Sequence, residues 1–164
     1  MYVGIDMAGA QNTWVASLQP ESGRIEIVES PKHSTLSEIV TYCSSRQVLA
    51  VAIDAQLTGA ISEENGFRSS DEELKSLLPI DCRVWVSSAS SLMAVPVRGR
   101  LIADKLSPDV PTIVETHPRA SLLLCLGPDY LESAKLYKSS DPAVAARHCL
   151  VLMNAWLEHW NIKD

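Results

Sequence analysis

Apolar residues in this chain gather in short continuous runs, and three of these runs end in a carboxylate. Runs rich in β-branched residues are typical of strands that are buried on both faces of an α/β sheet. Parallel strands place their carboxyl ends at one edge of a sheet, where open α/β sheets bind their ligands. We therefore expect the three terminal carboxylates to lie close together. The runs are Val3–Asp6, Leu49–Asp54 and Thr112–Glu115.

The remaining strand signals place these runs in a mixed sheet. Short links between the first three predicted strands force them into an antiparallel meander, with a turn at Pro20–Gly23. Later strands are separated by helical segments, so we expect them to be parallel. The predicted strands are Tyr2–Asp6, Thr13–Leu18, Arg24–Glu29, Val48–Asp54, Arg83–Val86 and Pro111–Glu115.

Helical patterns fill the spaces between the strands and after the last one. Ser34 or Thr35 is expected to cap the first helix, and Pro96 and Gly99 are expected to interrupt the segment 90–106. The fold class is therefore α/β, with helices flanking a mixed sheet in a single domain of residues 1–164. The predicted helices run to about Arg46, over Ser70–Leu78, from Pro118 to Gly127, and from Asp141 to about Trp160.

Composition limits the choice of partners. The 164 residues carry a net charge of −6, which argues against a broad basic surface but leaves a local basic segment at Arg98, Arg100 and Lys105. The apolar stretches are too short to span a membrane, and we expect no signal peptide because the chain enters its first strand at once. The four cysteines show no paired spacing, so we expect free thiols and a cytoplasmic protein.

The three carboxylates have a physical interpretation of their own. Close carboxylates repel one another, and a divalent cation is the usual compensating charge. The sequence therefore predicts a Mg²⁺ or Mn²⁺ site with Asp6, Asp54 and Glu115 as ligands. The alternative is that some of these acids cap helices, and Glu115 fits that alternative best because Pro118 begins a helix three residues later.

Charged residues after the second carboxylate are further candidates. Arg68 is expected to clamp a phosphate with its forked donors, while Asp71 orients it or adds a ligand. The alternative is a helix start, with Asp71 placed favourably near the helix N-terminus. His117 follows Glu115 by two residues and would share its face of a strand, as a proton shuttle or phosphate contact. Its alternative is a packed histidine at a strand-to-helix junction.

Other histidines and the tryptophans are expected to be structural. His33, His148 and His159 lack the spacing of metal ligands and are predicted to be structural or exposed. Trp14, Trp85 and Trp156 are predicted to pack in the core rather than stack on bases.

Five segments of the chain carry a family pattern, namely Gly4–Gly9 with Trp14-Val15, Ala52–Ala55, Phe67–Asp71, Val114–Pro118 and Tyr137-Lys138. Taken in this order, they resemble the family called domain of unknown function 429, whose members are described as predicted nucleases with a ribonuclease H-like fold. The order of predicted elements is also that of the ribonuclease H-like fold. The chain departs from the family pattern at three points. Gln56 stands where the family usually has proline, and Ser70 stands where a cysteine is common. Members usually carry a further acidic residue in a C-terminal helix, whereas here only Glu158 follows the Asp141 cap in the last helix.

The resemblance implies divalent-metal-dependent hydrolysis of nucleic-acid phosphodiester bonds. Asp6, Asp54 and Glu115 would then be the metal ligands. Arg68, Asp71 and His117 would handle the substrate phosphate.

Two other functions stay open. A degenerate member would bind a partner or nucleotide without cutting, and a third class would act on a small phosphorylated metabolite. A homodimer would be supported by an exposed edge strand among the first three, or by an exposed Trp160.

Overall fold

The computed structural model describes residues 1–9, 12–22, 24–59, 65–92 and 94–160. Internal contacts divide the chain into two compact units. The first unit is Met1–Arg68 with Ser87–His117, and the second is Ser69–Val86 with Pro118–Asp164. The single domain expected from the sequence stays a prediction, and each unit is described by itself below.

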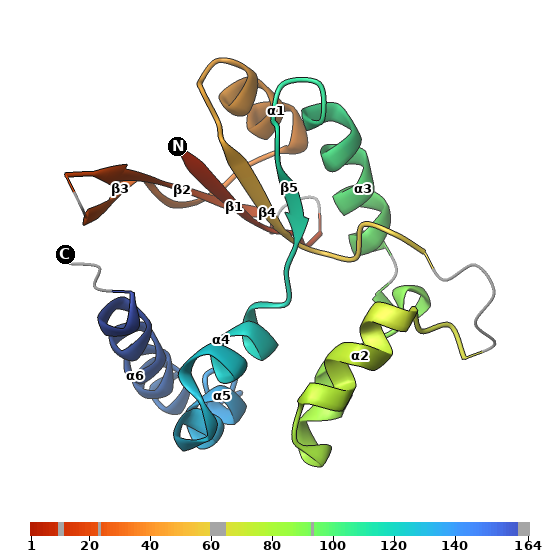
Figure 1. Cartoon of the computed structure of the whole chain (residues 1–164), viewed down its shortest axis with the longest axis vertical. Coiled ribbons are helices and arrows are strands. Elements are labelled where there is room, and N and C mark those ends of the chain that lie inside the picture. Colours follow the sequence, from red (N-terminus) through yellow and green to blue (C-terminus); the bar gives the residue numbers. More distant parts are fainter. Residues whose placement is uncertain (10–11, 23, 60–64, 93, 161–164) are drawn as a thin grey trace. The chain divides into compact units, whose positions relative to one another are not determined.

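The first unit is built on a mixed sheet of five strands in the order β3-β2-β1-β4-β5, within the described residues (Figure 1). β1 pairs antiparallel with β2 and parallel with β4, while β2 pairs antiparallel with β3 and β4 parallel with β5. The predicted meander and mixed α/β fold are therefore confirmed. The strands are β1 Tyr2–Asp6, β2 Trp14–Glu21, β3 Arg24–His33, β4 Ala50–Asp54 and β5 Ile113–Glu115.

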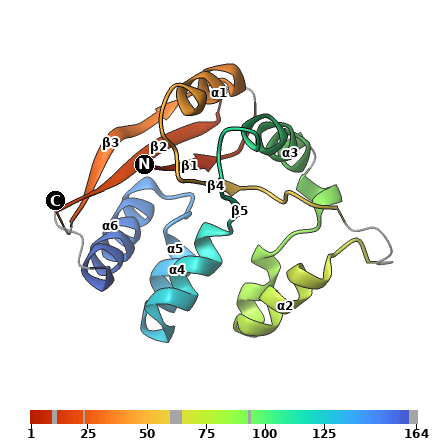
Figure 2. The ribbon, with the colours of Figure 1, turned by 45° about the horizontal axis from the view of Figure 1, so that its top comes forward.

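Two α-helices, α1 (Leu36–Ser44) and α3 (Ala94–Leu106), lie on the same face of this sheet (Figure 2). Of the two predicted caps, Ser34 and Thr35, the structure has Thr35, which forms a capping box with Glu38. The predicted break in the segment 90–106 is wrong from residue 94 onward, because α3 runs on through Pro96 and Gly99. Pro96 lies in the first turn, where no backbone donor is needed. A short 3₁₀ helix, η2 (Ala89–Leu92), precedes α3.

The core of the first unit lies between this face of the sheet and the two helices. Val3, Ile5, Val51 and Ile53 are buried there, together with residues of α1 and α3. Alternate residues of β1 point the other way and are exposed. The expectation that both faces of this strand are buried is therefore wrong for β1. Gly4, in the middle of the strand, is exposed.

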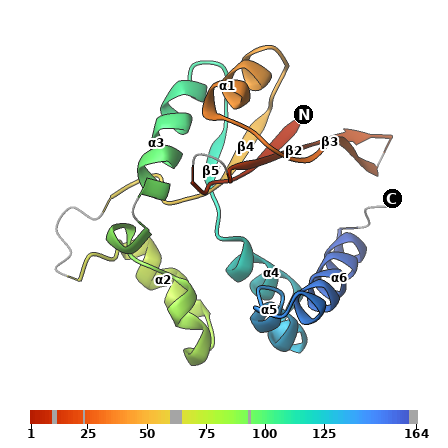
Figure 3. The same cartoon turned by 180° about the vertical axis from the view of Figure 1, so that it is seen from behind.

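The second unit is helical. Figure 3 shows α4, α5 and α6 side by side, and contacts between all three pairs confirm it. The predicted strand Arg83–Val86 is wrong, because residues 80–85 form the 3₁₀ helix η1. A small core joins Leu78, Cys82 and Leu123. The elements are α2 Ser69–Leu77, η1 Ile80–Trp85, α4 Pro118–Leu126, η3 Pro128–Tyr130, α5 Leu131–Leu136 and α6 Pro142–His159.

Local signals for two of these helices are confirmed. Pro118 begins α4, and Gly127 follows its end with a φ of 93°. Asp141 caps α6 by accepting hydrogen bonds from the amides of Ala143 and Val144. No helix in the described ranges combines the length and the hydropathy needed to cross a membrane.

The four cysteines are free, as predicted, and Cys43 and Cys82 are buried. Burial raises the pKa of the Cys43 thiol to about 11, so this side chain is a neutral part of the core.

Candidate functional site: one sheet edge with two faces

The carboxyl ends of β1, β4 and β5 lie at the same edge of the sheet, as their parallel pairing requires. Asp6 is the direct neighbour of Asp54, whereas Glu115 is the neighbour of Ile53, one residue earlier. Side chains alternate between the two faces of a strand, so this offset of one residue matters. Asp6 and Asp54 share one face, and Glu115 lies on the other face with the buried Ile53.

Glu115 is bound by Arg68 on that covered face. The guanidinium is bidentate, with Nη1 2.7 Å from Oε2 and Nη2 2.5 Å from Oε1 of the carboxylate. The amide of Leu57 donates to the same Oε2 at 2.8 Å. Only 8% of the Arg68 side chain is exposed, compared with 33% for Glu115. The pair therefore joins the loop after β4 to the end of β5, and each charge compensates the other.

Thr58 extends this arrangement. Arg68 Nη1 also donates to Thr58 Oγ1 at 2.9 Å, so the arginine holds two points of the loop that follows Asp54. These contacts give Arg68 a structural role at the sheet edge, and its predicted phosphate contact stays a prediction. It also explains why Glu115 lies at the sheet edge without joining the two aspartates.

Asp6 and Asp54 have different surroundings. Asp6 is exposed and forms no hydrogen bond or ion pair within the part of the chain that the structure describes, whereas Asp54 is half-buried. Neighbouring strands are about 4.8 Å apart, so two in-register carboxylates can reach one cation. Mg²⁺ is commonly held by one or two carboxylates together with water and substrate phosphate. The aspartate pair fits that ligand set.

The three predicted ligands do not share one face of the sheet. Among the described residues, no three His, Cys, Asp or Glu side chains gather closely enough to hold a metal ion. The register offset of Glu115 is the physical reason, because it sends the third carboxylate to the opposite face.

The aspartate pair is half of a longer row. Asp6 is also the direct partner of Trp14 on β2, and Trp14 is the partner of His33 on β3. Four strands thus contribute one side chain each to the same face, in the order Asp54, Asp6, Trp14, His33. The indole is 41% exposed, and the imidazole meets it edge-on at 4.0 Å between ring centres.

Burial of Trp14 in the core is therefore a wrong prediction. The buried Val15 beside it on β2 faces the helices, so Trp14 must face the other way. Alternation along 13–18 gives the same wrong answer, because it groups Trp14 with Ala16 and Leu18 as the more apolar face, whereas the buried face carries Thr13, Val15 and Ser17. The pairing with His33 could not be read from the sequence, because it depends on the register of the β2–β3 hairpin.

Two arginines of α3 hold the loops at this edge. Arg98 donates to Ala8 O at 3.1 Å and to Thr13 Oγ1 at 3.2 Å, which fixes the segment after Asp6. Arg100 donates through Nε to Leu57 O at 3.0 Å, beside the segment after Asp54. The predicted basic segment thus begins at the carboxylate edge, and the exposed Arg100 adds positive charge there.

Asp71 and His117 are the last two predicted site residues. Asp71 is a buried residue in the first turn of α2, in the second unit. β5 ends at Glu115, so His117 lies in the half-buried link to α4 rather than on the strand. The argument that strand alternation orients His117 like Glu115 is therefore wrong, while its proposed roles stay predictions.

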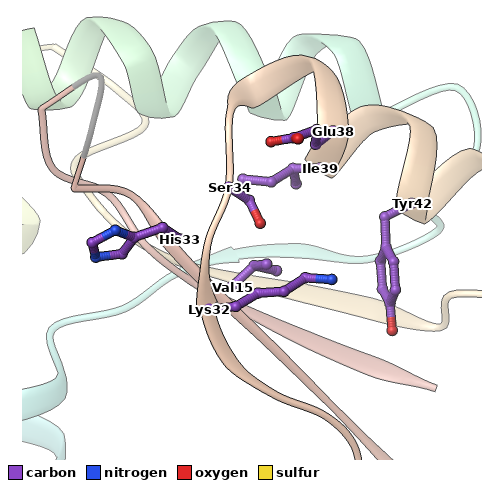
Figure 4. Close-up of a pocket in the computed structure, with 7 residues that line it drawn as sticks. All are labelled: Val15, Lys32, His33, Ser34, Glu38, Ile39 and Tyr42. Carbon is purple, nitrogen blue, oxygen red and sulfur yellow. The ribbon is translucent and has the colours of Figure 1, made fainter.

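A pocket of about 220 Å³ lies between β3 and α1 (Figure 4). Its Lys32 pairs with Glu29 at 2.9 Å, and its Glu38 accepts from the amide and hydroxyl of Thr35. The backbone hydrogen bond from Thr35 lowers the pKa of Glu38, so this carboxylate stays ionised. In Figure 4 the His33 ring is directed away from Glu38 and Tyr42. The pocket is small for a ligand site, and its two ionic groups already have partners.

Comparison of the chain with family models, with curated proteins and with solved structures finds no match. The resemblance to the domain of unknown function 429 family stays a prediction, which rests on the five segments described above.

Proposed function

We propose that this protein is a divalent-metal-dependent nuclease with a ribonuclease H-like fold. The observation that carries the proposal is the in-register pair Asp6 and Asp54, on adjacent parallel strands at the carboxyl edge of the sheet. The sheet order, three antiparallel strands followed by parallel ones, supports the fold. Exposed Arg100 near the same edge supports a phosphate-bearing substrate.

The aspartates would hold Mg²⁺ or Mn²⁺ through their carboxylate oxygens. Such an ion makes water more acidic and offsets the charge that develops on phosphate. Hydrolysis then forms a bond from a water oxygen to phosphorus, breaks the bond to the leaving oxygen, and transfers a proton to that oxygen. In this proposal Glu115 is a positioning residue, because its bond to Arg68 holds the loop that follows Asp54.

A second candidate is a domain that binds a partner without cutting it. The engagement of Glu115 by Arg68 favours it, because this leaves the site with fewer carboxylates than the sequence predicts. Hydrolysis of a small phosphorylated metabolite, the third class, has no comparable support from the structure.

Cleavage of a labelled panel tests the proposal: single- and double-stranded DNA, RNA and hybrid, each with Mg²⁺, Mn²⁺ or EDTA. Asp6→Asn is expected to lower the rate by about 1,000-fold, because it removes a ligand of an ion that supplies several kcal/mol. The matched control is Asp104→Asn, which removes the same charge from an exposed position of α3.

Cutting that survives in Asp6→Asn at the wild-type rate would refute the assignment. No cutting with any ion, together with binding of an oligonucleotide, would favour the non-catalytic domain. Phosphate release from a small phosphomonoester, without cutting of nucleic acid, would point to the third class.

A further inference from the structure

Trp14 and His33 form an aromatic pair on the face of the sheet opposite α1 and α3. The two rings are nearly perpendicular, at 77°, so the edge of one ring meets the face of the other. Trp14 is 41% exposed, and His33 is also exposed. A large indole held by a neighbouring ring yet open to solvent is an ordered apolar surface without a full complement of contacts.

The position of this pair ties it to the aspartates. Trp14 is one strand from Asp6 and two strands from Asp54, which corresponds to about 5 and 10 Å across the sheet. Each nucleotide carries a phosphate and a base on one sugar. A nucleic-acid strand with one phosphate over the aspartates therefore has a base within reach of the indole.

We propose that Trp14, positioned by His33, is a stacking platform for an unpaired nucleobase of the substrate. The choice of ligand rests on the proposed nuclease function. Every base has a flat π-face, so stacking on an indole tolerates any sequence. Bases of a duplex already stack on their neighbours, and an unpaired base is the one free to leave them. The substrate class is therefore single-stranded nucleic acid.

An exposed tryptophan can also belong to a protein interface, but the two aspartates that continue the row beside Trp14 favour a nucleobase. The neighbour of Trp14 toward β4 is a carboxylate without a described partner, followed by a second carboxylate. Carboxylates are depleted in the core of protein interfaces, whereas a metal with a nucleotide phosphate makes use of both.

Binding of a fluorescently labelled single strand, followed by anisotropy in EDTA at low salt, tests the platform without cleavage. The comparison strand has the same length but abasic sugars, so it keeps the phosphates and lacks the stacking groups. Trp14→Ala is expected to weaken binding of the ordinary strand by about 5- to 150-fold. Trp14→Phe should keep most of the affinity, and His33→Ala should fall between.

The matched control is Tyr2→Ala. Tyr2 is an aromatic side chain, 45% exposed, on the same strand face as Asp6 but at the other end of β1. This variant should bind like wild type. Trp14→Ala should bind ordinary and abasic strands equally, because the base-dependent part of the affinity is gone. Equal losses on both strands, or unchanged binding, would overturn the platform.

These results separate the two proposals. Base-dependent binding through Trp14 without any metal-dependent cutting supports the platform and refutes the nuclease. Cutting that requires Asp6, with binding indifferent to Trp14, supports the nuclease and refutes the platform.

Discussion

Two pairs of charged side chains lie at the same edge of the sheet of the first unit, and their surroundings are opposite. Arg68 and Glu115 compensate each other on the covered face, with hydrogen bonds to Thr58 and Leu57 around them. Asp6 and Asp54 carry the same charge and lie side by side on the other face. The first pair can stabilise the fold without a ligand, whereas like charges on neighbouring strands repel each other and favour a bound cation.

A register offset of one residue produces this difference. Had Glu115 paired with Asp54 instead of Ile53, it would have joined the aspartates. Three carboxylates at strand ends therefore do not imply three ligands, because the face on which each one lies decides its role.

The largest contrast in stability is expected between Glu115→Gln and Asp6→Asn. Glu115→Gln leaves the buried Arg68 guanidinium without its counter-charge and should lower the free energy of unfolding by about 2 to 4 kcal/mol. Asp6→Asn relieves a like-charge contact between neighbouring strands and should raise it by about 0.5 kcal/mol. Urea unfolding followed by circular dichroism measures both.

The double variant Arg68→Met with Glu115→Gln is the control for this contrast. Removing both charges should recover part of the loss, so the double variant is expected to be more stable than Glu115→Gln alone. A Glu115→Gln protein as stable as wild type would mean that the ion pair contributes nothing.

Gly99 and Gly4 allow the packing on the two faces of the sheet to be compared. A Cβ at Gly99 would lie 2.6 Å from the Cβ of Ala55, the residue after Asp54, whereas a Cβ at Gly4 would meet nothing within 4 Å. Gly99→Ala should therefore cost about 1 to 3 kcal/mol, because α3 must move away from β4. It should also slow cleavage, because Ala55 adjoins Asp54. Thermal unfolding and the cleavage assay measure the two effects.

Gly4→Ala is the matched control on the uncovered face. It should be neutral or slightly stabilising, since glycine weakens a strand interior and space is available. Equal losses in the two variants would contradict the view that only one face of the sheet is packed by the helices of this unit.

The sequence predicted most single strands and helices well. It did not predict the register between strands or the contacts between helices and strands. The carboxylate-ended strands, the Thr35 cap and the start of α4 follow from local signals, and the structure has all of them. The role of Glu115 required the β4–β5 register, and the role of Trp14 required the β1–β2 register. Gly99 was predicted to interrupt a helix because glycine is a poor helix former. Its close packing on Ala55 is a tertiary contact, which the local sequence does not reveal.

The smallest expected effect compares two arginines that hold the same loop. Arg68 is neutralised by Glu115, whereas exposed Arg100 donates to Leu57 O and has no carboxylate partner among the described residues. In our proposal this charge contacts a substrate phosphate. Arg100→Met should weaken binding of a single strand about threefold and reduce the slope of log affinity against log salt by about 1. Anisotropy titrations at several salt concentrations measure both.

Lys105→Met is the control for that measurement. Lys105 is an exposed cation in the last turn of α3, about 7.5 Å along the helix axis from Arg100, so its loss should leave the salt slope nearly unchanged. If both variants changed the slope equally, binding would follow the net charge of the helix rather than a contact at the edge. Only a larger effect at Arg100 would place the phosphate backbone beside Asp54, because Arg100 is fixed to the loop that follows this aspartate.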